Sequence, residues 1–130
     1  MTNDEFRTMG YQIIDWIANY RETVSEYQVV KALDSGTIRE QIPASPPEEP
    51  VAASQIFDDF EKILQPGLTH WQHPRFFGYF PANALLSSVL GDLLSSGLGV
   101  LGLNWQSSPA LTELEERVCD WLRQMVGLSS

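Results

Sequence analysis

The chain contains little cysteine and little positive charge. Only one cysteine, Cys119, occurs among its 130 residues, so neither an intrachain disulfide nor a cysteine zinc site can form. Eight Lys and Arg residues stand against 17 Asp and Glu residues, which gives a formal net charge of -9. Such a charge disfavours nucleic acid and anionic membrane surfaces as partners. We therefore expect a protein of the reducing cytoplasm, with no nucleic-acid and no membrane partner.

The sequence also lacks the marks of a secretory leader and of a membrane span. Residues 1–5 are acidic, whereas a leader needs a basic region followed by an apolar one. The longest weakly charged stretch, residues 76–112, contains Asp92 and is interrupted by prolines and glycines, so we expect no transmembrane helix. The 43% share of hydrophobic residues is typical of one globular domain with a modest core.

Hydrophobic periodicity predicts an all-α chain of about four helices. The first runs from Thr2 to about Ser25, where apolar residues recur at spacings of three and four and Thr2 forms a possible capping box with Glu5. A short second helix is expected over residues 53–64, ended by Pro66-Gly67.

Two further helices are expected in the second half of the chain. Asn83 is a candidate N-cap for a helix that ends near Leu98, and this helix is apolar nearly all round, which predicts burial on most of its sides. The last helix has Ser108 as its N-cap, Pro109 at its first position and Gly127 to close it.

Residues 26–52 are predicted to be a Pro-rich linker. Gly36 and four prolines break any regular element there, and residues 42–50 favour an extended, polyproline-like conformation. The predicted organisation is one N-terminal helical segment, residues 1–130, in which helix 1–25 and linker 26–52 precede a helical part 53–130 with an aromatic loop at 68–82. Because four helices leave apolar surface uncovered, we expect this segment to belong to a longer protein.

The most distinctive stretch is residues 69–82, with five aromatic rings and two histidines in fourteen residues and no helical or strand period. Four of the rings can bury roughly 600–1,000 Å², more than the largest apolar patch of a typical monomer. The stretch must therefore be buried in its own core, in a partner or around a ligand. From the residues alone, plain core packing is favoured.

The two histidines of this stretch have two interpretations. The spacing of three between His70 and His73 suits a metal or proton-transfer pair on a helix face. However, Pro74 argues against a helix and no third ligand is near in sequence, so a hydrogen-bonded structural role is favoured. We expect no metal site.

Other polar residues have ordinary structural explanations. Ser107-Ser108 could cradle a phosphate at a helix N-terminus, but ordinary capping is favoured. Only Arg117 and Arg123 near Cys119 could activate its thiol, so we expect no catalytic thiol. The helix dipole and solvation account for the acidic residues of the last helix.

Several stretches of this sequence together resemble one known protein family. The stretch from Pro66 to Pro74, continued through Phe80-Pro81, resembles the N-terminal region of the group II pyridoxal-phosphate-dependent amino-acid decarboxylases, closest to the aromatic-L-amino-acid (DOPA/tryptophan/tyrosine) decarboxylases. The likeness covers essentially the whole chain. It includes Glu5-Phe6, Ala18-Asn19-Tyr20, Ile42-Pro43, Glu61-Lys62-Ile63, Gly102, Trp105, Ser108-Pro109-Ala110 and Thr112-Glu113-Leu114-Glu115.

The resemblance implies the N-terminal segment of a fold-type I enzyme that uses pyridoxal 5'-phosphate and forms an obligate homodimer. It implies a substrate pocket to which Leu101 and Leu103 contribute from the partner subunit. Ala82 stands where many relatives carry Thr, and Leu103 where the animal enzymes carry Phe, so the choice of substrate stays open. The implied substrate-binding residues are Trp71, Tyr79, Phe80, Pro81, Ala82, Leu101 and Leu103.

The resemblance also implies that the cofactor domain, with its Schiff-base lysine, lies outside this chain. Lys31 and Lys62 are the only lysines present, and neither has the desolvated, phosphate-flanked setting that such a lysine needs. We therefore expect no catalytic and no cofactor-binding residue in this segment, which should be inert and bind no pyridoxal phosphate by itself.

The predicted function is thus that of a dimerisation and substrate-pocket segment of a decarboxylase acting on aromatic L-amino acids. The alternative is a free-standing helical protein-interaction module whose aromatic loop binds a partner. An interaction module has no need of Trp71 and Tyr79-Phe80-Pro81 together with Gly102 and Trp105. Self-association, as a homodimer or a higher assembly, is expected because apolar surface remains uncovered.

Overall fold

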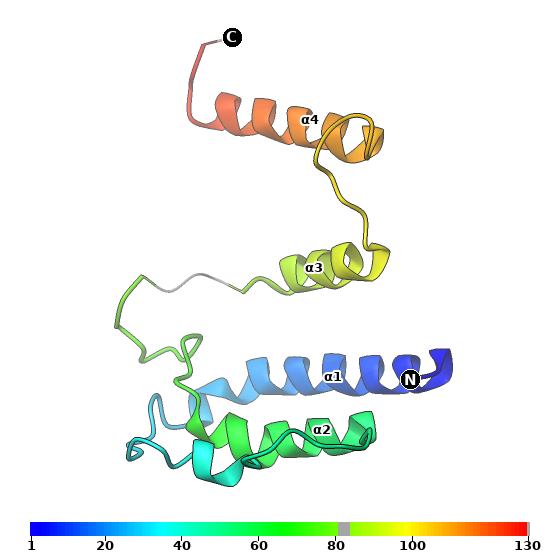
Figure 1. Cartoon of the computed structure of the whole chain (residues 1–130). Coiled ribbons are helices and arrows are strands. Elements are labelled where there is room, and N and C mark those ends of the chain that lie inside the picture. Colours follow the sequence, from blue (N-terminus) through cyan, green and yellow to red (C-terminus); the bar gives the residue numbers. More distant parts are fainter. Residues whose placement is uncertain (81–83, 130) are drawn as a thin grey trace. The chain divides into compact units, whose positions relative to one another are not determined.

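The computed structural model describes residues 1–80 and 84–129 and divides the chain into two compact units, Met1–Asn83 and Ala84–Ser130 (Figure 1). Over the described residues every regular element is helical, so the predicted all-α class is confirmed. The first unit contains α1 (Asn3–Thr23) and α2 (Ala53–Asp59), and the second contains α3 (Leu86–Leu98) and α4 (Pro109–Met125).

The predicted capping box starts α1. The hydroxyl of Thr2 accepts a hydrogen bond from the backbone N–H of Glu5 at 3.2 Å, and the carboxylate of Glu5 accepts one from the N–H of Thr2 at 2.7 Å. The Thr2 N–H stabilises the charged carboxylate and so lowers the pKa of Glu5. After Thr23 the chain tightens into a 3₁₀ turn, Val24–Glu26, whose Val24 is buried.

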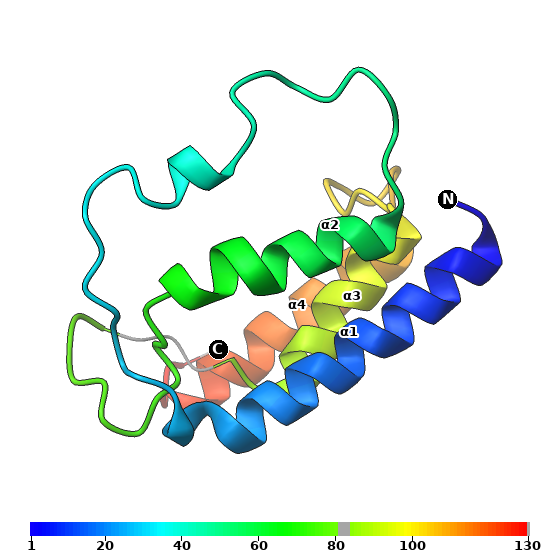
Figure 2. The same cartoon turned by 90° about the horizontal axis from the view of Figure 1, so that it is seen from below.

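Aromatic rings join α1 to α2, which lie side by side in Figures 1 and 2. The Trp16 ring packs edge-on against Phe57, with centroids 6.2 Å apart, and against Phe60 at 5.2 Å. The single helix predicted over 53–64 is wrong in detail, because α2 gives way to a π-helical turn, Phe60–Leu64, and then to a 3₁₀ turn, Gln65–Gly67. Pro66 has no N–H with which to continue a regular helix.

Between the Val24–Glu26 turn and α2, the connection has one further 3₁₀ turn, Arg39–Gln41, and otherwise bends without a regular element. Figure 2 shows it as a wide loop beside α2. The connection lies against the 3₁₀ turn Gln65–Gly67 where Ile38 meets Gly67, since a Cβ atom at position 67 would lie only 2.8 Å from Cδ1 of Ile38. A side chain at position 67 would therefore force the end of the Ile38 side chain to shift.

In the second unit, α3 begins later than predicted and buries little. Asn83, the expected N-cap, lies outside the described residues, and Leu85 occupies the N-cap position of the helix. The prediction that this helix is buried on most sides is wrong within the structure, because its five leucines are all exposed. The 47 residues of the unit give α3 no partner surface large enough to cover an all-round apolar helix.

The ends of α4 are set by local signals. Ser108 holds the N-cap position as predicted, although its hydroxyl makes no capping hydrogen bond. Instead Asn104 and Ser107 bond reciprocally just before the helix, at 2.9 and 3.0 Å. Gly127, at φ +72°, follows the helix, and the N–H of Leu128 reaches back to the carbonyl of Arg123, which is a Schellman ending.

None of the helices in the described part of the chain is both long enough and apolar enough to span a membrane.

Candidate functional site

The loop that follows α2 is built from two successive turns. The N–H of His73 donates to the carbonyl of His70, and the N–H of Phe76 donates to the carbonyl of His73, each at 2.9 Å. The turn residues His70 and His73 are among the most buried side chains described, at 5% and 3% exposure. Trp71, which lies between them in sequence, is 44% exposed. The turns therefore separate an inner pair of histidines from an outer tryptophan.

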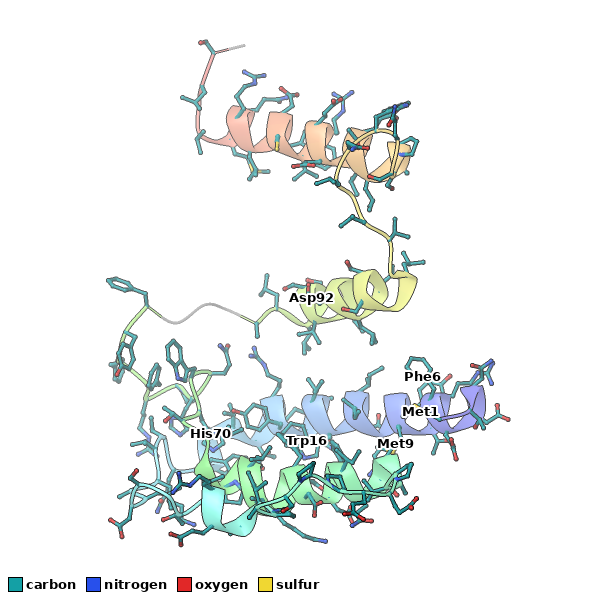
Figure 3. All side chains as sticks on the ribbon, in the orientation of Figure 1. Met1, Phe6, Met9, Trp16, His70 and Asp92 are labelled. Carbon is teal, nitrogen blue, oxygen red and sulfur yellow. The ribbon has the colours of Figure 1, made fainter. Side chains whose placement is uncertain are left out.

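His70 binds the end of α1 through its ring and the segment that follows α1 through its backbone. Its Nδ1 lies 2.8 Å from the hydroxyl of Tyr20, and its backbone N–H donates to the carbonyl of Val29 at 2.9 Å. In Figure 3, His70 lies where the loop meets the C-terminal end of α1. The Tyr20 and Tyr27 rings flank His70, with centroids 5.6 and 4.8 Å away.

Protonation decides the direction of the Tyr20–His70 bond. Burial lowers the pKa of His70, and the neighbouring His73 lowers it further. Burial also raises the pKa of the Tyr20 phenol. The neighbouring Tyr27 raises this pKa further, whereas Arg21 lowers it. Both directions favour a neutral pair, and the tautomer of His70 sets whether the Tyr20 O–H donates to Nδ1 or Nδ1–H donates to the phenol oxygen.

His73 bridges the loop to the residues just after α1. The backbone N–H of Arg75 donates to its Nδ1 at 2.9 Å, so the proton of the neutral ring must be on Nε2. Nε2 then donates to the carbonyl of Ser25 at 3.2 Å. The predicted hydrogen-bonded structural role of the two histidines is thus confirmed.

A further contact lies between the two histidines, where Arg21 Nη1 donates to Oε1 of Gln72 at 2.8 Å. Residues 70–73 are therefore held to residues 20–29 by a set of hydrogen bonds that we call the loop anchor. Its members are Tyr20–His70, Val29–His70, Arg21–Gln72 and Ser25–His73.

Outside the loop anchor, three rings form a layer that we call the aromatic stack. Trp71 packs against Phe76, with centroids 5.2 Å apart, and lies almost parallel to Tyr79, at 5.5 Å and an interplanar angle of 4°. Tyr79 has φ +54°, a left-handed conformation that costs a residue with a side chain about 1–2 kcal/mol. Strain of this kind clusters at functional sites.

The first unit does not bury the aromatic loop as a core. Tyr79 is 83% exposed, Phe77 90% and Phe80 fully exposed. Of the three destinations that the sequence left open for this loop, a core within the first unit is therefore excluded.

The structure brings together only some of the predicted substrate-binding residues. Trp71 and Tyr79 stack on one another, and Phe80 follows at the end of the same loop. Leu101 and Leu103 are exposed residues of the second unit. Pro81 and Ala82 lie outside the described residues.

Neither lysine offers a site for pyridoxal phosphate. Lys62 is exposed and its Nζ lies 3.6 Å from a carboxylate oxygen of Asp58. Lys31 is exposed and lines an open cavity of about 380 Å³ whose other lining residues, among them Pro66 and Leu68, include no second cation for a phosphate. The residues described here therefore do not fit the cofactor, and no catalytic step is assigned to them.

Other candidates can be placed as well. Cys119 is exposed. In the described part of the chain, no three His, Cys, Asp or Glu side chains come close enough to hold a metal ion.

Sequence reasoning missed the partners of the histidines. The sequence singles out Tyr20 only within the stretch that carries the family resemblance, and it indicates no role for Arg21. The available signal was a tyrosine and an arginine at the end of a helix, with two histidines to be paired about fifty residues later. Sequence spacing alone does not reveal a contact over that separation.

Comparisons of this chain with a family model and with known proteins agree on one family. The family model described as the pyridoxal-dependent decarboxylase conserved domain matches residues 35–130. The chain is 45% identical over 125 residues to tyrosine/DOPA decarboxylase 1 of Papaver somniferum, covering 96% of this chain and 24% of that protein. It is also 45% identical over 123 residues to histidine decarboxylase of Mus musculus, covering 95% of this chain and 19% of that protein.

A solved structure agrees with these matches. The chain superposes on tryptophan decarboxylase of Catharanthus roseus, crystallised with L-tryptophan, with a TM-score of 0.92 and 38% identity. The match covers 99% of this chain and 28% of that one. The chain therefore spans about a quarter of the length of the relatives it matches.

Proposed function

From the fact that this chain belongs to the pyridoxal-dependent decarboxylase family, we propose that it is the N-terminal segment of an enzyme that decarboxylates aromatic L-amino acids. Its part in the reaction is to bind and orient the substrate side chain. The carboxylate is lost at a centre that residues outside this segment provide, with pyridoxal phosphate as the electron sink.

The observation that carries this proposal is the aromatic stack. Trp71 and Tyr79 lie nearly parallel, both keep exposed ring surface, and the strained backbone at Tyr79 holds the second ring in place. A flat apolar wall of this kind favours a planar aromatic side chain over a small aliphatic one. Packing a substrate ring against the wall would also remove water from it.

The relatives narrow the substrate class without fixing it. The names of the matched proteins contain tyrosine, DOPA, tryptophan and histidine, all of which carry a planar ring. We propose that the common requirement is this ring. A wall built from Trp71 and Tyr79 recognises its flat face, whatever polar groups it carries.

The segment is further proposed to act as a dimerisation element in the cytoplasm and to be inert alone. Its second unit exposes leucines along α3, among them Leu90 and Leu94, and two-fold pairing is the commonest way to bury such a surface. Inertness follows from the setting of Lys31 and Lys62, both solvent-exposed.

The function is tested on a full-length enzyme that carries this segment, loaded with pyridoxal phosphate. Release of CO₂ is measured with L-tyrosine, L-tryptophan and L-histidine, and with L-alanine as the aliphatic control. We expect release from at least one aromatic substrate and none from L-alanine. Equal release from both classes, or none from the aromatic ones, would contradict the proposal. The 130-residue chain alone, given the same cofactor, should release no CO₂ and develop no aldimine absorbance.

A further inference from the structure

Trp71 is fixed indirectly, through the residues on either side of it. Among the described residues its ring contacts are Phe76 and Tyr79, both in its own loop. By contrast, the preceding residue, His70, and the following residue, Gln72, both bind the end of α1. The position of Trp71 relative to the helices therefore depends on these two neighbours.

The helix side of the loop anchor is itself held by ring packing. Tyr20 stacks on Trp16 with centroids 5.3 Å apart and rings 2° from parallel. Trp16 in turn packs against Phe57 and Phe60 beyond it, and lies between α1 and α2 in Figure 3. The hydroxyl of Tyr20 is thus presented to His70 from a ring that the two helices hold in place.

From these contacts we infer that Tyr20 and Arg21 are positioning residues, which set Trp71 within the aromatic stack and thereby tune substrate affinity. Neither residue belongs to the aromatic stack. Tyr20 acts through His70, and Arg21 acts through Gln72. The structural part of this inference stands on the contacts alone, and the part that concerns substrate rests on the proposed function.

The chain offers a matched pair of substitutions for a test. Tyr20→Phe removes the hydroxyl that is hydrogen-bonded to His70 and keeps the ring that stacks on Trp16. Tyr27→Phe is the control, because it removes the hydroxyl of the other tyrosine beside His70. The hydroxyl of Tyr27 forms no hydrogen bond within the described residues. Arg21→Met is a second, independent break of the loop anchor at a side chain that is partly exposed.

The first readout is the ¹⁹F NMR spectrum of the chain labelled with 5-fluorotryptophan, in which Trp71→Phe assigns the resonance of Trp71. The Trp71 shift depends on the ring currents of Phe76 and Tyr79. We expect Tyr20→Phe and Arg21→Met to move or broaden this resonance, and Tyr27→Phe to leave it in place. An unmoved Trp71 resonance in Tyr20→Phe and Arg21→Met, or an equal change in Tyr27→Phe, would overturn the inference.

The second readout is steady-state kinetics of a full-length enzyme that carries this segment. Tyr20→Phe should raise KM for an aromatic substrate about two- to tenfold, the range that loss of one hydrogen bond allows, with kcat nearly unchanged. A shifted Trp71 resonance with an unchanged KM would overturn the role in affinity. If the unsubstituted enzyme decarboxylates no aromatic amino acid, the proposed function fails, while the NMR readout still decides whether Tyr20 and Arg21 position Trp71.

Discussion

The two units of this chain are held together by different kinds of interaction. In the first unit, helix packing and the loop anchor join residues about fifty positions apart and bury His70 and His73. In the second unit, Ser108 is the one buried residue among those that the structure describes. The hydrogen bonds of the second unit join residues close in sequence, such as Asn104 and Ser107.

This difference indicates what each unit needs from elsewhere. The first unit can fix its loop with its own polar contacts and presents an aromatic stack that is already ordered. The second unit has well-ended helices with uncovered apolar faces, so its tertiary position must come from other surfaces. If this contrast is real, substitutions in the two units should change different properties.

The largest expected effect concerns association through the second unit. Leu90→Glu with Leu94→Glu places two charges on one exposed face of α3 and should weaken self-association of the chain more than tenfold, since each buried leucine contributes about 1.5–3 kcal/mol. Sedimentation velocity at micromolar concentrations measures this. Ser88→Glu with Ser95→Glu adds the same charge on the opposite side of α3 and should have a smaller effect. A concentration-independent monomer before any substitution would show that the segment covers its own surface.

The next effect concerns the stability of the first unit. His73→Ala removes the hydrogen bonds to Ser25 and Arg75 from a nearly inaccessible site and should lower the free energy of unfolding by about 2–3 kcal/mol. Urea unfolding followed by ¹⁹F NMR can separate the units, because Trp16 and Trp71 lie in the first and Trp105 and Trp121 in the second. Glu49→Ala, on the exposed connection, should change this energy by less than about 0.5 kcal/mol. A loss shared equally by all four tryptophans would contradict separate units.

Acid should weaken the first unit before the second. Because burial lowers the pKa of His70 when the chain is folded, the unfolded chain takes up the proton first, at about pH 6.5. The contribution of neutral His70 to the free energy of unfolding is complete above that pH. It declines as the pH falls toward the pKa of His70 in the folded chain. The urea midpoint reported by Trp71 should therefore fall between about pH 8 and pH 5. In His70→Gln, which has no titrating ring, the fall should be smaller, and an unchanged fall would assign it to other groups.

The smallest effect is local to the helix ends of the second unit. Gly127→Ala places a Cβ atom at φ +72° and should cost the end of α4 about 1 kcal/mol. Gly97→Ala lies inside α3, where a Cβ atom meets nothing within 4 Å, and should stabilise that helix by up to about 1 kcal/mol. Circular dichroism should show helicity lost in the first variant and gained in the second. Opposite signs would mean that helix termini are not set locally.

Local chemistry explains which parts of the fold were predictable. The capping box of Thr2 and Glu5 and the positive φ of Gly127 are consequences of neighbouring residues, so the sequence indicates them directly. The hydropathy period carries no sign of the π-helical turn at Phe60–Leu64, whose first residue packs against Trp16.

For the candidate site, the aromatic residues were predictable and their support was not. Trp71 and Tyr79 were identified from the resemblance of the loop to a family, and the structure places their rings together. The loop anchor depends on Tyr20, Arg21 and the end of α1, a contact between distant segments that only the fold creates. The roles of Leu101 and Leu103 stay predictions.

The central claim is that the aromatic stack is a wall for the substrate ring and not a core of the first unit. It is tested most directly by kcat/KM of a full-length enzyme carrying Tyr79→Ala, compared with Tyr79→Phe, which keeps the ring, and with Phe77→Ala, which removes a ring that has no ring partner among the described residues.

We predict that Tyr79→Ala lowers kcat/KM for an aromatic L-amino acid roughly five- to 150-fold, which corresponds to a loss of about 1–3 kcal/mol of transition-state stabilisation. The unfolding temperature should stay nearly unchanged. Tyr79→Phe and Phe77→Ala should stay close to the unsubstituted enzyme. A collapse of thermal stability in Tyr79→Ala, with a normal kcat/KM in the enzyme that remains folded, would contradict the account.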